Sequence, residues 1–92
     1  MKVYNENEVN EKLKDLNDWS YSDKSIEKTF EVDDFTSALA FTLKAGIYAE
    51  KADHHPDILI HSWNKVKITL STHSEGGVTD NDFDLASKFD KI

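Results

Sequence analysis

Four histidines are the side chains of this sequence best suited to chemistry at neutral pH, and three of them are close together. His54, His55 and His61 fall within eight residues, and His73 follows further along the chain. Imidazole titrates near pH ~6.5, so a group of histidines can donate and accept protons at neutral pH without a metal. The cluster therefore predicts general acid–base catalysis, such as an elimination that moves protons.

Two carboxylates near the histidine pair are candidates to orient an imidazole. Glu50 lies four residues before His54, one helical turn away if the helix continues, and Asp53 is its direct neighbour. A nearby carboxylate stabilises the charged form of an imidazole. The alternative is a solvated helix end without a catalytic role, because positive charge is favoured near a helix C-terminus.

Other chemistries find less support in the sequence. Neighbouring histidines and carboxylates can bind a divalent ion, but adjacent histidines project in different directions and the His-Glu-x-x-His spacing is absent. The Gly-x-Ser-x-Gly elbow of a serine hydrolase is missing, and Gly76-Gly77 is not part of a phosphate-binding loop. Cysteine and arginine do not occur, which excludes thiolate ligands and guanidinium clamps. We therefore predict no metal site.

Length and charge define the class of protein. The 92 residues, 38% of them hydrophobic, suit a single domain over residues 1–92. A net charge of −7 repels phosphate backbones and anionic lipid, so we expect neither nucleic acid nor membrane as a partner. No apolar stretch approaches the roughly 18 residues of a membrane span, and the acidic N-terminus lacks a secretory signal. These features predict a soluble cytoplasmic protein.

The N-terminal part of the chain is predicted to form a helix and a hairpin. Apolar residues at helical spacing behind an Asn5 cap predict a helix over about residues 6–17. Alternating apolar and polar residues from Trp19 to Val32, around a turn at residues 22–25, predict two antiparallel strands. Lys28 interrupts the apolar face of this hairpin.

A long helix is predicted from a cap at Asp33 or Asp34 to about Lys51. A surface helix needs only one apolar face, and this one has more. We expect the second face to be covered by another helix or by a partner subunit, which predicts a homo-oligomer, most simply a dimer. One apolar stripe consists of Phe35, Leu39, Leu43 and Ile47, and another of Phe41 and Tyr48.

The remaining elements are a second hairpin and a last helix. Pro56 ends the long helix, and apolar residues alternate over 58–61 and again from Val66 to His73. Thr79 and Asp82 have the spacing of a capping box at the start of the last helix. The order αββαββα predicts an α+β fold, a four-stranded antiparallel sheet with three helices packed on one face.

This fold brings distant histidines toward each other. If the two hairpins pair in one sheet, the end of the last strand lies near the loop after the long helix. His54, His55 and His73 would then surround one site, and His61 would lie outside it. Strand parity places His73 on the polar side of its strand with Ser71, which predicts that it faces solvent or a cleft.

Residue types and spacings through the second half of the chain also match a known signature. The matching positions are the run Glu50–Pro56, Trp63, the run Asn64–His73 and Asp82, with looser agreement at Trp19 and at Asp34-Phe35. The chain thereby resembles the pterin-4a-carbinolamine dehydratases, whose element order also fits the one predicted here.

This resemblance implies a lyase that dehydrates 4a-hydroxytetrahydrobiopterin, or a related 4a-hydroxytetrahydropterin, to the quinonoid dihydropterin in pterin recycling, without a cofactor. The 4a-hydroxyl leaves as water while a proton leaves N5, which requires an acid, a base and polar groups around the ring. The resemblance implies proton transfer by His54 and His73, with His55 binding the pterin and assisting. Asp53, Ser71 and Thr72 match pterin-lining positions, and Glu50 is a supporting residue.

Some positions of the sequence depart from the pattern of this family, and an alternative function stays open. Lys44 stands where the long helix often carries arginine, and His61 is not a motif residue. Some animal members bind a homeodomain transcription factor, a role that nothing in this acidic sequence supports. The alternative function is a non-enzymatic protein-interaction module that keeps the fold and the histidines.

Overall fold

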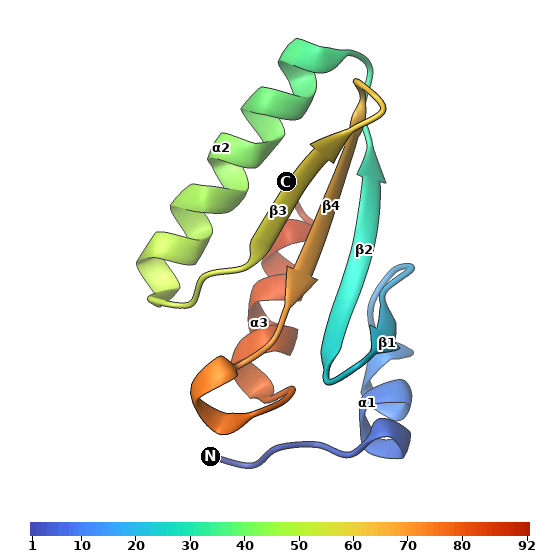
Figure 1. The fold of residues 1–92 in the computed structure, drawn as a ribbon, viewed down its shortest axis with the longest axis vertical. Helices are drawn as coiled ribbons and strands as arrows, with labels where there is room; N and C mark the ends of the chain where they lie inside the picture. Colours follow the sequence, from blue (N-terminus) through green and yellow to red (C-terminus); the bar gives the residue numbers. More distant parts are fainter.

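Three helices and four strands follow one another in the predicted order. The computed structural model describes residues 1–92. Figure 1 shows the four strands as one sheet, with the N-terminus close to the loop that precedes the last helix. The elements are α1 (Glu6–Leu13), β1 (Ser20–Ser22), β2 (Ser25–Glu31), α2 (Phe35–Ala52), β3 (Asp57–His61), β4 (Lys65–Leu70), a short 3-10 helix η1 (His73–Glu75) and α3 (Asp80–Phe89).

The sheet is antiparallel throughout and has the strand order β1-β2-β4-β3. Its two hairpins meet along β2 and β4, where Ile26 pairs with Leu70 and Phe30 with Val66. This pairing confirms the predicted four-stranded antiparallel sheet. It also leaves β1 and β3 as the two edge strands, so the segment after α2 enters the sheet at an edge.

Both hairpins turn through residues with positive φ. Asp23 and Lys24 have φ values of 48° and 64°, and Ser62 and Trp63 have 50° and 56°. A two-residue hairpin turn in which both residues have positive φ has a backbone twist that matches the right-handed twist of the paired strands. The first turn lies within the predicted residues 22–25.

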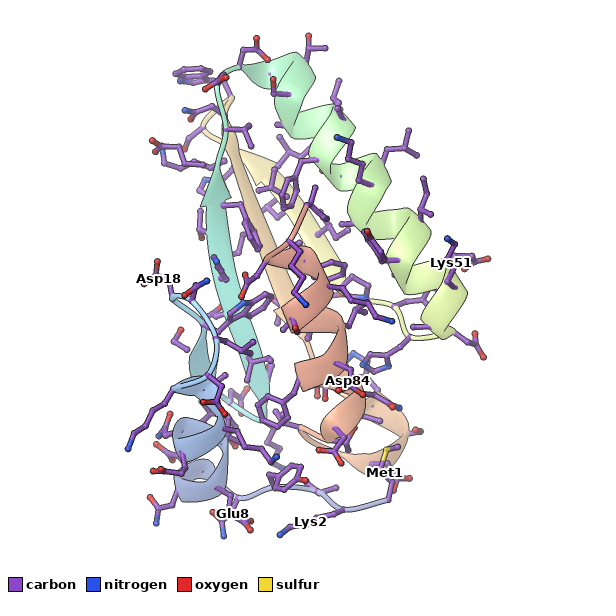
Figure 2. All side chains as sticks on the ribbon, turned by 180° about the vertical axis from the view of Figure 1, so that it is seen from behind. Met1, Lys2, Glu8, Asp18, Lys51 and Asp84 are labelled. Carbon is purple, nitrogen blue, oxygen red and sulfur yellow. The ribbon has the colours of Figure 1, made fainter.

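All three helices contribute to one hydrophobic core on one face of the sheet. In β4, Val66 and Ile68 are fully buried, whereas Lys67 on the opposite face is half-exposed. Figure 2 shows α3 in front of the sheet, on the face that carries this core. The core consists of Val9, Leu13, Trp19, Ile26, Ala38, Ala45, Ala49, Val66, Ile68, Leu70, Val78, Leu85, Ala86 and Phe89.

The first helix is shorter than the predicted range of 6–17, because it ends at Leu13. Its Asn5 cap is present as predicted. Beyond the helix, three consecutive backbone N–H groups donate to carbonyls three residues back, and Asp18 takes a φ of 64°. This tighter turn still packs Leu16 against the core, so the apolar spacing extends further than the helix does.

Lys28 interrupts the apolar face of the first hairpin because it pairs with a carboxylate inside the protein. Its ammonium lies 2.7 Å from Oδ1 of Asp90, at the end of α3, and 4.5 Å from the ring centroid of Phe30. The indole Nε1 of Trp19 donates to the same carboxylate at 3.0 Å. The inward-facing lysine therefore ties β2 to α3 with its charge paired.

Helix α2 packs on the sheet through small residues and leaves large apolar side chains outside. Ala38 and Ala45 are fully buried, whereas Leu43 is 68% exposed. None of the helices is long and apolar enough to cross a membrane. Four side chains form the exposed stripe, namely Phe35, Leu39, Leu43 and Ile47.

Candidate active site

The histidines of the predicted site come from two segments at the same end of the sheet. His54 and His55 lie between α2 and β3, and His73 follows β4. The start of β3 is paired with the end of β4, where Asp57 lies opposite Thr69. The predicted approach of these two segments is therefore present in the fold.

The end of α2 fixes the backbone of His54. The helix stops at Ala52, and Asp53 takes a left-handed conformation with a φ of 49°. The N–H of His54 then donates to the carbonyl of Ala49 at 3.1 Å, which closes the last turn. Pro56 follows directly and cannot continue a helix. The helix end predicted before Pro56 is confirmed.

His54 is held by a buried carboxylate from α3. Its Nε2 lies 2.5 Å from Oδ1 of Asp82, whose side chain is entirely buried. The second oxygen of Asp82 accepts the N–H of Thr79 at 3.0 Å and the hydroxyl of Thr72 at 2.9 Å. Burying a carboxylate is costly unless it is hydrogen-bonded, and here both oxygens are. The imidazole is thus anchored through one nitrogen.

The other nitrogen of His54 is free for chemistry. Nδ1 makes no hydrogen bond within the chain, and the side chain keeps 12% of its surface exposed. His54 lines a hollow of about 110 Å³ between α2 and α3, and Figure 2 shows the end of α2, marked by Lys51, beside the helix that carries Asp84. An anchored imidazole with one free nitrogen suits general acid–base catalysis.

His55 has a different partner and environment. Its Nε2 lies 2.8 Å from Oε1 of Glu50, and both side chains are largely exposed. Glu50 therefore contacts His55 and not His54. Asp53, the other candidate carboxylate, forms no hydrogen bond or ion pair with either imidazole and is instead the C-cap residue of α2.

His73 lies in a turn beyond β4. The strand predicted to reach His73 stops at Leu70, because the chain folds back and the N–H of Thr72 donates to the carbonyl of Gly77 at 2.8 Å. Gly76 closes this turn with a φ of 77°. His73 is exposed, in keeping with its predicted polar side. The hollow beside it, of about 290 Å³, is lined by Asp23, Lys24, Ser25, Ser71, His73 and Gly76.

No hollow of the chain is lined by two of the three histidines. The two segments are joined instead by hydrogen bonds, since Asp82 binds both His54 and Thr72, the residue before His73. The largest hollow, of about 360 Å³, lies on α2 and the C-terminus. A single pocket around His54, His55 and His73 stays a prediction.

The remaining positions suggested by the sequence differ in accessibility. The Ser71 hydroxyl donates to the carbonyl of Lys24 at 2.9 Å, and Thr72 is only 6% exposed. His61 belongs to the outer face of β3, and its Nδ1 lies 3.1 Å from the hydroxyl of Ser62. No group of three or more His, Cys, Asp or Glu side chains has an arrangement that could hold a metal ion.

Sequence reasoning did not find the partnership of Asp82 with His54. The capping box of Thr79 and Asp82 was predicted and is present, with the Asp82 carboxylate accepting the Thr79 N–H. A capping carboxylate uses one oxygen in this way. The capping box therefore indicates that the second oxygen is free to accept from another side chain. Which side chain that oxygen meets depends on how α3 packs against the end of α2.

The whole chain also matches one protein family. A family model described as pterin 4 alpha carbinolamine dehydratase covers residues 2–92. The chain belongs to this family. The His54–Asp82 pair therefore lies in a member of the pterin 4 alpha carbinolamine dehydratase family.

Relatives within this family are similar over nearly their full length. A protein of Roseiflexus castenholzii, provisionally named a pterin-4-alpha-carbinolamine dehydratase, is 48% identical over 90 residues, which are 98% of this chain and 96% of the relative. A protein of Sulfolobus acidocaldarius with the same provisional name is 44% identical over 87 residues, covering 95% and 94% of the two chains.

Two solved structures resemble the fold. The transcriptional coactivator/pterin dehydratase from Brucella melitensis superimposes with a TM-score of 0.90 at 40% identity, covering 98% of this chain and 97% of that one. A pterin dehydratase-like protein described as a RuBisCO assembly factor has a TM-score of 0.66 at 19% identity, over 82% and 88% of the chains. The second likeness concerns the fold alone.

Proposed function

We propose that this chain dehydrates a 4a-hydroxytetrahydropterin, such as 4a-hydroxytetrahydrobiopterin, to the quinonoid dihydropterin and water in pterin recycling. The observation that carries the proposal is the His54 imidazole, anchored by the buried Asp82 and free at Nδ1. Membership of the pterin-4a-carbinolamine dehydratase family supports the substrate class. The cytoplasm stays the predicted compartment.

The proposed reaction needs two proton transfers. The C4a–O bond breaks and the hydroxyl leaves as water after receiving a proton, while the electrons of the N5–H bond form the C4a=N5 bond and that proton goes to a base. His54 and His73 are proposed for these transfers around the leaving hydroxyl. His55 is proposed to bind the pterin ring and assist, with Glu50 holding its imidazole at 2.8 Å.

One assay distinguishes an active dehydratase from a protein that shares the fold but has no activity. Water loss from chemically generated 4a-hydroxytetrahydropterin is followed with and without the protein. The proposal predicts that the protein accelerates water loss in proportion to its concentration. A rate equal to the uncatalysed one at all protein concentrations would contradict it.

The proposed mechanism uses imidazoles and no metal-bound water. Activity should therefore persist after exhaustive treatment with a chelator. A pH profile alone does not distinguish the two mechanisms, because zinc-bound water also ionises near pH ~7. Activity that disappears on stripping and returns with zinc would contradict the metal-free mechanism.

A non-enzymatic interaction module is the second candidate function. The observation that favours it is the apolar stripe of α2, in which Phe35 is 53% and Ile47 is 50% exposed. Apolar surface of this kind marks interaction sites on otherwise polar proteins. One solved relative is described as a transcriptional coactivator as well as a pterin dehydratase.

We further propose that this stripe pairs with a second copy of the chain in a homodimer. The stripe repeats every four residues from Phe35 to Ile47, so two antiparallel copies of α2 place the same four side chains against each other. An isologous contact of this kind is typical of twofold dimers. The hollow lined by Ile47 and Tyr48 extends the same surface.

Charges at the two ends of α2 support antiparallel pairing. Asp33 and Asp34 precede the helix, whereas Lys44 and Lys51 lie in its second half. Neither lysine forms an ion pair within the chain. Antiparallel copies bring the aspartates of one helix toward the lysines of the other, and the two helix dipoles also oppose each other favourably.

A further inference from the structure

The hydroxyl of Thr72 lies inside the protein, beside the carboxylate that anchors His54. It is 2.9 Å from Oδ2 of Asp82 and 2.7 Å from the hydroxyl of Thr79. We propose that Thr72 is a positioning residue, whose hydroxyl fixes Asp82 so that Asp82 fixes the tautomer and orientation of the His54 imidazole. This inference rests on the proposed function and assigns Thr72 a role within it.

The proposed role assigns a place to each proton. A carboxylate without a proton only accepts, so the role requires the Thr72 hydroxyl, the Thr79 N–H and Nε2–H of His54 all to donate to Asp82. A hydroxyl has a single proton, so Thr72 must accept the bond from the Thr79 hydroxyl. The Thr79 oxygen in turn accepts the N–H of Asn81 at 3.3 Å. Only Nδ1 of His54 is left to exchange protons.

The two oxygens of Asp82 are held unequally. Oδ2 receives two hydrogen bonds, from the Thr79 N–H and the Thr72 hydroxyl, whereas Oδ1 receives only the bond from His54. Thr72 and Thr79 belong to different segments, one after β4 and one before α3. Their bonds from two directions prevent the carboxylate from turning, and this keeps Oδ1 directed at His54.

Removing the Thr72 hydroxyl has two consequences for this arrangement. Oδ2 of Asp82 keeps only the Thr79 N–H, and the Thr79 hydroxyl loses its acceptor inside the protein. An unpaired buried donor is costly, so the Thr79 hydroxyl would compete for the carboxylate. Asp82 would then no longer have one fixed orientation toward His54.

Direct contact between the Thr72 hydroxyl and the pterin is the competing role, since its position matches a pterin-lining position of the family. Such a contact needs a hydroxyl that is accessible from the substrate side. The only proton of the Thr72 hydroxyl is directed at Asp82, one lone pair of its oxygen accepts from Thr79, and the residue is 6% exposed. The geometry therefore favours action through Asp82.

The test combines kinetics with NMR of the substrate-free protein. Thr72→Val removes the hydroxyl at nearly constant volume, and Thr72→Ser keeps it. Imidazole ¹⁵N shifts of the wild-type protein should show the His54 proton on Nε2, with slow exchange against solvent. In T72V we expect loss of the slowly exchanging proton, and a kcat lowered roughly 10- to 100-fold with KM changed less than about twofold. T72S should restore both.

Two results would overturn the positioning role. One is a wild-type His54 with its proton on Nδ1. The other is a folded T72V that raises KM at unchanged kcat and keeps the wild-type NMR spectrum, which is the signature of a substrate contact. If T72V does not fold, Thr72→Ala removes the same hydroxyl and is expected to show the same losses.

The NMR measurement also separates this inference from the proposed function. A wild-type protein without dehydratase activity but with a protected Nε2 proton, lost in T72V, would contradict the function and support the positioning role. An active wild-type enzyme whose T72V variant matches it in rate and spectrum would support the function and contradict the positioning role.

Discussion

Nε2 of His54 lies 2.5 Å from Oδ1 of Asp82, a carboxylate with no exposed side-chain surface. The two residues are 28 positions apart in the sequence, and they join the end of α2 to the first turn of α3. A carboxylate in this place anchors an imidazole through one nitrogen and leaves the other for proton transfer.

Replacing Asp82 by Asn is expected to lower kcat for water loss by roughly 10²- to 10⁴-fold, the usual contribution of a positioned acid or base. An amide offers a single acceptor oxygen, so it cannot accept from Thr72, Thr79 and His54 together, and its NH₂ group would favour the wrong tautomer of His54. Circular dichroism establishes that the variant is folded. Asp15→Asn, which changes an exposed carboxylate in the turn after α1 that does not line the hollow beside His54, should keep the wild-type rate. Equal rates for D82N and the wild type would contradict the role of Asp82.

Local patterns allowed most of the fold to be predicted, and only part of the site. The Asn5 cap, a cap at Asp33 or Asp34, the first hairpin turn and the alternation in β4 depend on neighbouring residues, so the sequence contains them directly, and the structure selects Asp34 as the second cap. The length of α1 was overestimated because Leu16 reaches the core from a turn rather than a helix. The partnership of His54 with Asp82 depends on packing between two helices, which no local pattern encodes.

Removing the ammonium of Lys28 should destabilise the protein strongly. Lys28→Ala leaves the Asp90 carboxylate, which is only 7% exposed, without its opposite charge, and the expected loss is about 3 kcal/mol of unfolding free energy. Lys67→Ala is the matched control on the outer face of the sheet, where Lys67 pairs with Glu27 at 3.1 Å and the expected loss is below about 1 kcal/mol. Denaturant unfolding measures both. Similar losses for the two variants would contradict the structural role of the Lys28–Asp90 pair.

A charge in the middle of the exposed stripe of α2 should dissociate the proposed homodimer. Leu43→Asp places a carboxylate where two copies would bury apolar side chains, so we expect it to sediment as a monomer at concentrations at which the wild type is a dimer. Leu59→Asp, at another exposed apolar position on the edge strand β3, should remain a dimer. A dimeric Leu43→Asp beside a monomeric Leu59→Asp would place the interface on the sheet edge. A monomeric wild type would contradict the homodimer altogether.

Stability in acid should depend partly on the cap of α2. The Ser37 N–H donates to the Asp34 carboxylate at 2.7 Å and lowers the pKa of this group below its ordinary value of 3.8. A lowered pKa stabilises the fold above the ordinary value, and this contribution is lost as the pH falls through the lowered pKa. Asp34→Asn keeps the cap without the charge, so its unfolding free energy should fall less steeply below pH ~4 in acid titrations. Parallel curves for the two proteins would contradict this.

Proton transfer by His54 is tested most directly by the rate of water loss from 4a-hydroxytetrahydropterin with His54→Ala, measured beside His61→Ala. If the free nitrogen of His54 transfers a proton in the reaction, the first variant should be slower than the wild type by roughly 10²- to 10⁴-fold, while the second keeps the wild-type rate. A folded His54→Ala protein that dehydrates the pterin at the wild-type rate would contradict proton transfer by His54.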